Sequence, residues 1–279
     1  MIEDTSQGGE TSYVSNIYQD NPQNGLILVD VGAFGRQGSN TYGLLKNGWT
    51  GLLIDANPDR IPIINNEFKN LQYKLVNCAI GSSNGSATLY VRGSVGSSSL
   101  IPSWETKYGT EKTTEVQVVP LDSVLTENNI PYNFDLLSID AEGMDKIIFE
   151  NLMASKYLPK TIITEVTSYG SDEEMKSLFN SYGYAFMKRF EEGNPHGNAI
   201  FKLKNNQLTC FYNDWHLGDC LWTTIYFNLI LGHNDIDIVF YCNPAYHTEL
   251  KELLLPEYKS RVAFKSNTEC DKSKSINTH

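Results

Sequence analysis

The stretch LILVDVGAFGRQGSNTYGLLKNGWTGLLIDANP (residues 26–58) decides the fold. It begins with a short apolar run that ends around Asp30 and meets a glycine-rich turn, as buried parallel strands do. Residues 42–47 then predict a short helix that stops at Gly48, and residues 50–54 predict a second strand that ends at Asp55. A strand, a helix and a strand in this order predict a right-handed crossover and a parallel sheet.

The same alternation continues along the chain. Further strands are predicted at residues 72–78, 134–139 and 161–164, and helices at 143–152 and 172–181. Residues 184–188 and 198–203 can form a closing antiparallel pair, while the glycine- and serine-rich stretch 81–109 predicts an edge hairpin with a mobile loop. The sequence therefore predicts an α/β fold with a doubly wound, mostly parallel sheet and an antiparallel closing strand.

A polar joint at residues 205–207 (NNQ) divides the chain into two predicted domains, 1–206 and 207–279. The second reads as a small βαβα extension, with strands at 208–212 and 237–242, and its last ten residues read as a disordered tail. Two parallel strands are too few for a core. We therefore expect this piece to pack on the first domain, to pair with another copy in a homo-oligomer, or to be part of something longer.

Composition narrows the classes of partner. The 279 residues carry a net charge of −11, which argues against nucleic acid, and no apolar run is long enough to span a membrane. The five cysteines (Cys78, Cys210, Cys220, Cys242 and Cys270) include no CxxC pair. We read them as free thiols of a reducing compartment, and expect a cytoplasmic protein.

The turn after the first strand carries an acid. Its glycines follow GxxGxxG spacing and not the GxGxxG of dinucleotide-binding proteins, and Asp30 precedes Gly32. A carboxylate there would repel a pyrophosphate but suits the ammonium and sulfonium of S-adenosylmethionine (SAM), and Gly32 would let the backbone approach the ligand. The alternative is a tight turn without a ligand.

Asp55 ends the second strand, 25 positions after Asp30. A carboxylate there can accept hydrogen bonds from both ribose hydroxyls of NAD or SAM. The alternative is a helix-capping aspartate before Asn57. Cys78 and Ala79, at the end of the third strand, could border an adenine, although small residues there are also ordinary packing.

Carboxylates also follow the fourth and fifth strands. Asp140, Glu142 and Glu165 lie at predicted strand ends, and His196 lies on the turn before the last strand. Clustered carboxylates need a cation, a hydrogen-bond network or a catalytic use. Asp140 and Glu165 could hold Mg²⁺ or Mn²⁺, or act with His196 as a base. The alternative makes Glu142 a helix cap and Glu165 a ribose or backbone acceptor.

Taken together, these residues resemble the FkbM-type SAM-dependent methyltransferases. The similar segments are SQGGE (6–10), the stretch 30–58, FDLLSIDAEG (134–143), TEV (164–166) and NAIF (198–201). They occur in order over about residues 6–204. The resemblance implies a class I, Rossmann-like fold and methyl transfer from SAM to a hydroxyl, often on a sugar or glycan.

The same resemblance implies roles for individual residues. Asp30 and Gly32 would face the methionine part of SAM, Asp55 would bind the ribose, and Asp140 would lie beside the methyl group. Gln7 and Glu10 would close the site from the N-terminal side. The SAM-binding stretch adds three further expected cofactor contacts, Ser39, Asn40 and Asn57.

The C-terminal piece carries a weaker likeness. The turn HLGD (216–219), a helix and DIVFYCNP (237–244) resemble the first strands of a GT-B glycosyltransferase, which would imply a fused or partner glycosyltransferase. Two other functions stay open from the sequence. One is an NAD(P)-dependent oxidoreductase, which Asp55 permits and Asp30 disfavours; the other is a non-catalytic module that retains a vestigial SAM fold.

Overall fold

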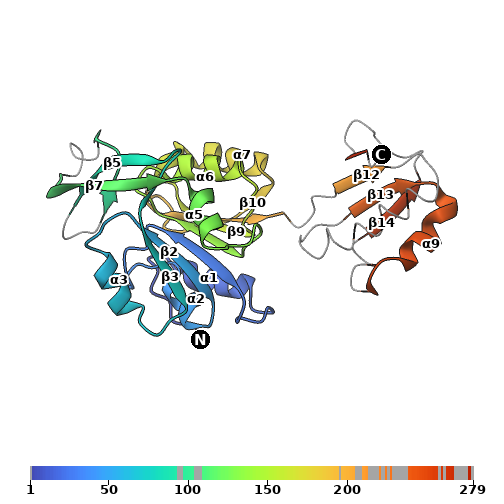
Figure 1. Ribbon diagram of the computed structural model, residues 1–279, viewed down its shortest axis with the longest axis horizontal. Coiled ribbons are helices and arrows are strands. Elements are labelled where there is room, and N and C mark those ends of the chain that lie inside the picture. The colour runs from blue at the N-terminus through green and yellow to red at the C-terminus, as the bar shows by residue number, and fades with distance from the viewer. Residues whose placement is uncertain are drawn as a thin grey trace. The chain divides into compact units, whose positions relative to one another are not determined.

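The computed structural model describes residues 2–92, 97–103, 109–194, 196–204, 209–212, 220, 224, 227, 238–256, 259, 262–266 and 276–277. It divides into two compact units, Met1–Leu203 and Lys204–His279, and each is described here by itself (Figure 1).

The first unit is built on a seven-stranded sheet with the order β10-β11-β9-β8-β1-β2-β3. The strands are β1 Ile27–Val31, β2 Thr50–Asp55, β3 Tyr73–Asn77, β8 Leu136–Ile139, β9 Thr161–Glu165, β10 Tyr184–Arg189 and β11 Asn198–Leu203. Strand β11 pairs antiparallel with both β9 and β10, and the other pairs are parallel. The predicted doubly wound sheet with an antiparallel closing strand is confirmed. From β1 the sheet grows first to one side, through β2 and β3, and then to the other side, through β8 and β9. Open α/β sheets bind ligands at the point where the strand order reverses in this way.

Both faces of this sheet are buried. Consecutive residues enter two different apolar clusters, Val29 and Leu52 on one face, Leu28 and Leu53 on the other, because side chains alternate along a strand. The helices are α1 Glu10–Ile17, α2 Tyr42–Lys46, α3 Ile61–Glu67, α5 Leu121–Glu127, α6 Asp145–Met153 and α7 Asp172–Ser181, with a 3₁₀ turn η1 at Thr167–Tyr169. The result is a three-layered unit that leaves the carboxyl ends of the strands open for a site.

A second, smaller sheet belongs to the same unit and lies at one end of it in Figure 1. Its order is β4-β7-β5-β6, from β4 Ala79–Ile80, β5 Gly85–Val91, β6 Ser98–Ser99 and β7 Lys112–Val119. The expected edge hairpin within residues 81–109 is present, because β5 pairs antiparallel with β6 at the edge of this sheet. On its other side β5 pairs along its whole length with β7. The residues 93–96, where the mobile loop was expected, lie outside the described part.

The second unit has a four-stranded parallel sheet with the order β14-β13-β12-β15. Its elements are β12 Thr209–Tyr212, β13 Ile238–Cys242, η2 Pro244–Tyr246, α9 His247–Glu252, β14 Val262–Ser266 and β15 Ile276–Asn277. The two-stranded βαβα prediction is therefore wrong, and so is the disordered tail where β15 lies. Strand β14 has three apolar residues followed by Lys265 and Ser266, and β15 is very short, so neither shows the longer apolar run that marks a buried strand.

The predicted turn at 216–219 lies outside the described residues, as does most of the predicted helix after it. In the part of the chain that the structure describes, no helix has the length and apolar character needed to cross a bilayer.

Candidate active site

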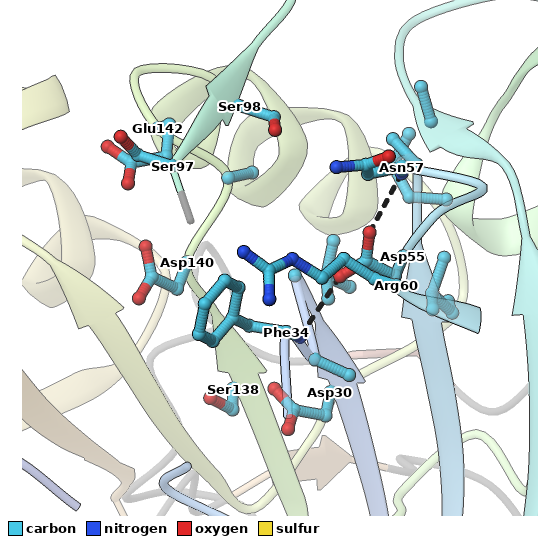
Figure 2. A pocket seen from close by; sticks show the side chains of 18 of the residues that line it. Asp30, Phe34, Asp55, Asn57, Arg60, Ser97, Ser98, Ser138, Asp140 and Glu142 are labelled. Atoms are coloured by element: carbon cyan, nitrogen blue, oxygen red, sulfur yellow. Dashed lines mark hydrogen bonds between the residues drawn. The ribbon is translucent and has the colours of Figure 1, made fainter. Parts of the chain in front are cut away.

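A cavity of about 200 Å³ opens at the carboxyl ends of β1, β2 and β8 (Figure 2). Most of the residues predicted as cofactor contacts line it, together with one predicted catalytic residue: Gln7, Asp30, Gly32, Ser39, Asn40, Asp55, Asn57, Cys78, Ala79 and Asp140. The other predicted residues, Glu10, Glu165 and His196, are not among the residues that line it.

Asp30 is buried at the end of β1, and its carboxylate accepts a hydrogen bond from Thr41 Oγ1 at 2.6 Å. Burial raises the pKa of Asp30 to about 6, while hydrogen bonds from Thr41 and Ser138 oppose the shift. Beside it, Asn40 Nδ2 donates to Ser138 Oγ at 3.4 Å, whereas the buried Asn40 Oδ1 has no hydrogen-bond partner among the described residues. This end of the cavity thus offers acceptors to a cationic donor.

Gly32 follows β1 with a φ of +88°, in the region that favours glycine. A Cβ at this position would lie 1.9 Å from the carbonyl oxygen of Asp140. The structural requirement for glycine is therefore the close approach of the loops that follow β1 and β8.

Asp55 ends β2, and its two carboxyl oxygens accept the backbone N–H groups of Asn57 at 2.8 Å and Phe34 at 3.0 Å. Asp55 therefore ties two loops together and does not cap α3, whose N-cap is Arg60 without a side-chain hydrogen bond. Each of its oxygens keeps a lone pair for a ligand. Burial raises the pKa of Asp55, and the hydrogen bonds and the Arg60 charge oppose this.

Arg60 is a functional candidate that the sequence analysis missed. Its guanidinium lies 3.7 Å from the centre of the Phe34 ring, and both side chains line the cavity (Figure 2). Burial lowers its pKa, while the Asp55 charge raises it. A basic residue three positions after Asn57, at a strand end already marked by Asp55, was the available signal.

Asp145 was missed as well, because the pattern placed it inside a helix. It is fully buried in the first turn of α6, where its carboxylate accepts hydrogen bonds from Ser168 Oγ at 2.9 Å and from the backbone N–H groups of Gly143 at 3.3 Å and Ala141 at 3.4 Å. These bonds hold the turn of residues 140–143, in which Glu142 has a φ of +47°.

Four acids in this region have raised pKa values, with burial as the first cause in each. Burial raises the pKa of Asp145 to about 6, of Glu142 to about 7 and of Glu165 to about 8. The pKa of Asp140 is raised well above its ordinary value by burial and by the neighbouring carboxylates, Glu142 first among them. The group can therefore hold protons near neutral pH, as a site for proton transfer must.

Glu165 and His196 form a pair of their own. Glu165 Oε1 is 2.9 Å from His196 Nδ1 and accepts a hydrogen bond from Thr167 Oγ1 at 3.1 Å. Glu165 Oε2 is buried and has no partner within the described ranges. No three His, Cys, Asp or Glu side chains of the described residues come together to hold a metal ion, so the Mg²⁺ or Mn²⁺ site at Asp140 and Glu165 stays a prediction.

The N-terminal segment lies against the loop after β1. The N–H of Gly38 donates to the Thr5 carbonyl at 2.8 Å, and Thr11 Oγ1 donates to the Asn40 carbonyl at 3.0 Å. Glu10 is buried and uses its carboxylate internally, accepting from Asn198 Nδ2 at 2.9 Å and the Gly8 N–H at 2.8 Å. Gln7 lines the cavity, and Glu10 fixes the segment that carries it.

Comparison with known proteins identifies the family. The profile described as the Methyltransferase FkbM domain matches residues 30–186, more than half of the chain. The chain belongs to the FkbM methyltransferase family. The resemblance seen in the sequence is confirmed, and the matched range contains the cavity-lining acids of β1, β2 and β8.

Two solved structures similar to this FkbM-family chain are described as methyltransferases. The O-methyltransferase from Bacillus cereus in complex with SAH is 13% identical, with 72% of this chain and 83% of that chain covered and a TM-score of 0.41. The TehB-like SAM-dependent methyltransferase from Corynebacterium glutamicum is 14% identical, with 72% and 90% covered and a TM-score of 0.38. No curated protein sequence matches the chain.

The family and the sheet topology together establish a class I, Rossmann-like SAM-dependent methyltransferase. The oxidoreductase alternative, which rested on Asp55 alone, is therefore wrong: an acid at the end of β2 serves the ribose in either class and cannot separate them.

Proposed function

We propose that this FkbM-family domain methylates a hydroxyl of a sugar or glycan, using SAM as the donor. The observation that carries the proposal is the shared cavity, in which the acids at the ends of β1 and β2 meet the proton-holding acid Asp140 at the end of β8. The choice of a sugar hydroxyl is supported by the family resemblance.

The residues of the cavity fit SAM. Asp30 and Asn40 Oδ1, which has no partner among the described residues, can accept from the ammonium and face the positive sulfonium. The remaining lone pairs of Asp55 can accept from the ribose hydroxyls. Cys78 and Ala79 border the adenine. SAM supplies an electrophilic methyl group, so the protein must orient the acceptor and remove its proton.

Asp140 is the proposed base. A hydroxyl has a pKa far above 7, so transfer needs a group that takes its proton. Burial raises the pKa of Asp140, which makes its ionised form a stronger proton acceptor than an ordinary carboxylate. The Glu165–His196 pair is the proposed group that accepts the proton from Asp140. The competing mechanism has Asp140 and Glu165 bind Mg²⁺ or Mn²⁺. Turnover that survives EDTA would exclude the metal mechanism. Turnover that is lost in EDTA and restored by added metal would establish it.

Incubation with methyl-labelled SAM and a glycan panel, followed by mass spectrometry, tests the proposed function. We expect a single added methyl group on a hydroxyl. Methylation of nitrogen or carbon would contradict the proposed acceptor, and SAM binding without transfer to any acceptor would favour the vestigial module.

Replacing Asp55 by alanine should weaken SAM binding by about 1–3 kcal/mol, because the ribose hydroxyls lose a charged acceptor in a partly buried site. Isothermal titration of SAM measures the change. Asp59→Ala, an exposed acid on the same loop, is the control and should bind SAM as the wild type does. Equal affinities in all three proteins would place the ribose elsewhere.

SAM affinity should depend on pH through Asp30. Its pKa of about 6 means that it is protonated in the free protein below pH 6, and the cationic ligand binds the ionised form. The Kd should therefore rise about tenfold from pH 7 to pH 5. Titrations at both pH values, repeated with Asp30→Asn, check this. A variant with the same pH dependence would assign the effect to another group.

We further propose that residues 1–206 carry the whole activity, with residues 207–279 left for pairing with another copy or with a glycosyltransferase. Deleting everything after Gln207 should preserve SAM binding and methyl transfer within about twofold, since Met1–Leu203 is a compact unit with its own core. Titration and turnover assays measure both. A truncated protein that folds and binds SAM but cannot methylate would give the second unit a part in the acceptor site.

A further inference from the structure

One side of the cavity is formed by β5, β6 and the residues next to β6, and the proposed SAM contacts do not use it. Leu89 of β5, Ser97 and Ser98 at β6, and Leu100 line it, facing Glu142 and Met144 of the segment that follows β8. Figure 2 shows Ser97, Ser98 and Glu142 grouped together, apart from both Asp30 and Asn57. Since Asp140 precedes this turn, a ligand bound there would have the proposed base next to it.

Ser98 is the first observation that points to a ligand. Its Oγ is buried without a hydrogen-bond partner in the described part of the chain, although it lines the cavity. The next residue, Ser99, turns the other way and donates to the carbonyl oxygen of Glu142 at 2.8 Å. Successive side chains of a strand point to opposite faces. The Ser99 hydroxyl therefore binds β6 to the turn that contains Glu142, and the Ser98 hydroxyl is left to interact with a ligand in the cavity.

Glu142 is the second observation. Its backbone adopts a left-handed conformation, which is strained for a residue other than glycine and persists only where surrounding contacts impose it. Those contacts are the bonds from Ala141 and Gly143 to Asp145 and the bond from Ser99. Its side chain lines the cavity, and burial raises its pKa to about 7, so it can accept or donate a hydrogen bond near neutral pH.

The lining has the chemistry of polyol recognition. A hydroxyl and a carboxyl that line the same side of a cavity can bind two neighbouring hydroxyls of a ligand, and Leu100 and Met144 offer apolar surface to the C–H face of a ring. In their ionised forms, Asp140 and Glu142 disfavour an anionic ligand. We propose that Ser98 and Glu142 form the acceptor subsite and bind adjacent hydroxyls of a neutral sugar. This inference rests on the proposed function, but sugar binding can be measured without methyl transfer.

The test uses the full chain saturated with SAH and a panel of neutral methyl glycosides of glucose, galactose and mannose. Saturation-transfer NMR should detect at least one of them, and Ser98→Ala and Glu142→Gln should each raise its Kd about tenfold. The affinity for SAM should stay within twofold in both variants. Ser86→Ala, which removes an exposed hydroxyl of β5 in the same sheet, is the control and should change neither.

The outcomes separate the two proposals. If SAM does not bind, the proposed function fails. If SAM binds and no neutral glycoside does, or if both variants bind the glycoside as the wild type does, the subsite is wrong and the methyltransferase stands. Binding of methyl glucosaminide alone would show that the carboxylates select a cation, and would also overturn the inference.

Discussion

Replacing Asp140 by asparagine is expected to lower the rate of methyl transfer by about 100-fold or more, the range seen when a base or a metal ligand is lost. The amide keeps the shape of the side chain but cannot take a proton. SAM affinity should change little, because the proposed contacts to the ammonium, the ribose and the adenine are made by other residues of the cavity. Single-turnover rates with labelled SAM, at saturating acceptor, measure the chemical step directly.

Two further variants are measured together with Asp140→Asn. Glu165→Gln interrupts the pair with His196 and should also slow transfer about 100-fold if the pair carries the proton onward. Glu173→Gln, an exposed acid of α7, should leave the rate unchanged. Near-wild-type turnover in both Asp140→Asn and Glu165→Gln would end the catalytic assignment.

Replacing Gly32 by alanine is expected to destabilise the first unit by about 2–5 kcal/mol. A left-handed backbone costs a non-glycine residue roughly 1–2 kcal/mol, and overpacking adds about 1–3 kcal/mol. The added Cβ would meet the carbonyl oxygen of Asp140, a backbone atom that cannot rotate away. Urea denaturation followed by circular dichroism measures the change in the free energy of unfolding.

Alanine variants of two other glycines separate the backbone cost from the overpacking cost. Gly25 has a φ of +106° with nothing within 4 Å of a Cβ, so Gly25→Ala should show the backbone cost alone. Gly85 has open space and no positive φ, so Gly85→Ala should stay within about 0.5 kcal/mol of the wild type. A Gly32→Ala protein as stable as Gly25→Ala would mean that the two loops can move apart.

The central sheet was predictable because its strands are buried on both faces and show as apolar runs. Residues 26–31 and 50–54 are such runs, and their order along the chain leaves few topologies. Strands β14 and β15 were not predicted because β14 has only three apolar residues before Lys265 and Ser266, and β15 has only two residues, which pair with the distant β12. Their formation depends on long-range pairing, which local patterns do not record.

The site was predictable in part for the same reason. Asp30, Asp55 and Asp140 follow apolar runs, and parallel strands bring their carboxyl ends to one edge. Asp145 and Ser98 left no such mark, because Asp145 reads as a helix residue and Ser98 lies in a serine-rich stretch. Glu10 was predicted to close the site because its segment, residues 6–10, resembles the FkbM family. In the structure its carboxylate accepts a hydrogen bond from Asn198 and does not line the cavity.

The order β10-β11-β9 also constrains how the protein is made on the ribosome. Strand β10 leaves the exit tunnel before β11, yet its place at the sheet's edge exists only after β11 has paired with β9. A nascent chain that ends before residue 198 therefore exposes the backbone of β9, the kind of edge on which other chains add strands. The FkbM domain should consequently need protection by chaperones until its last strand emerges, and premature termination in residues 166–197 should yield aggregates and not a shortened soluble enzyme.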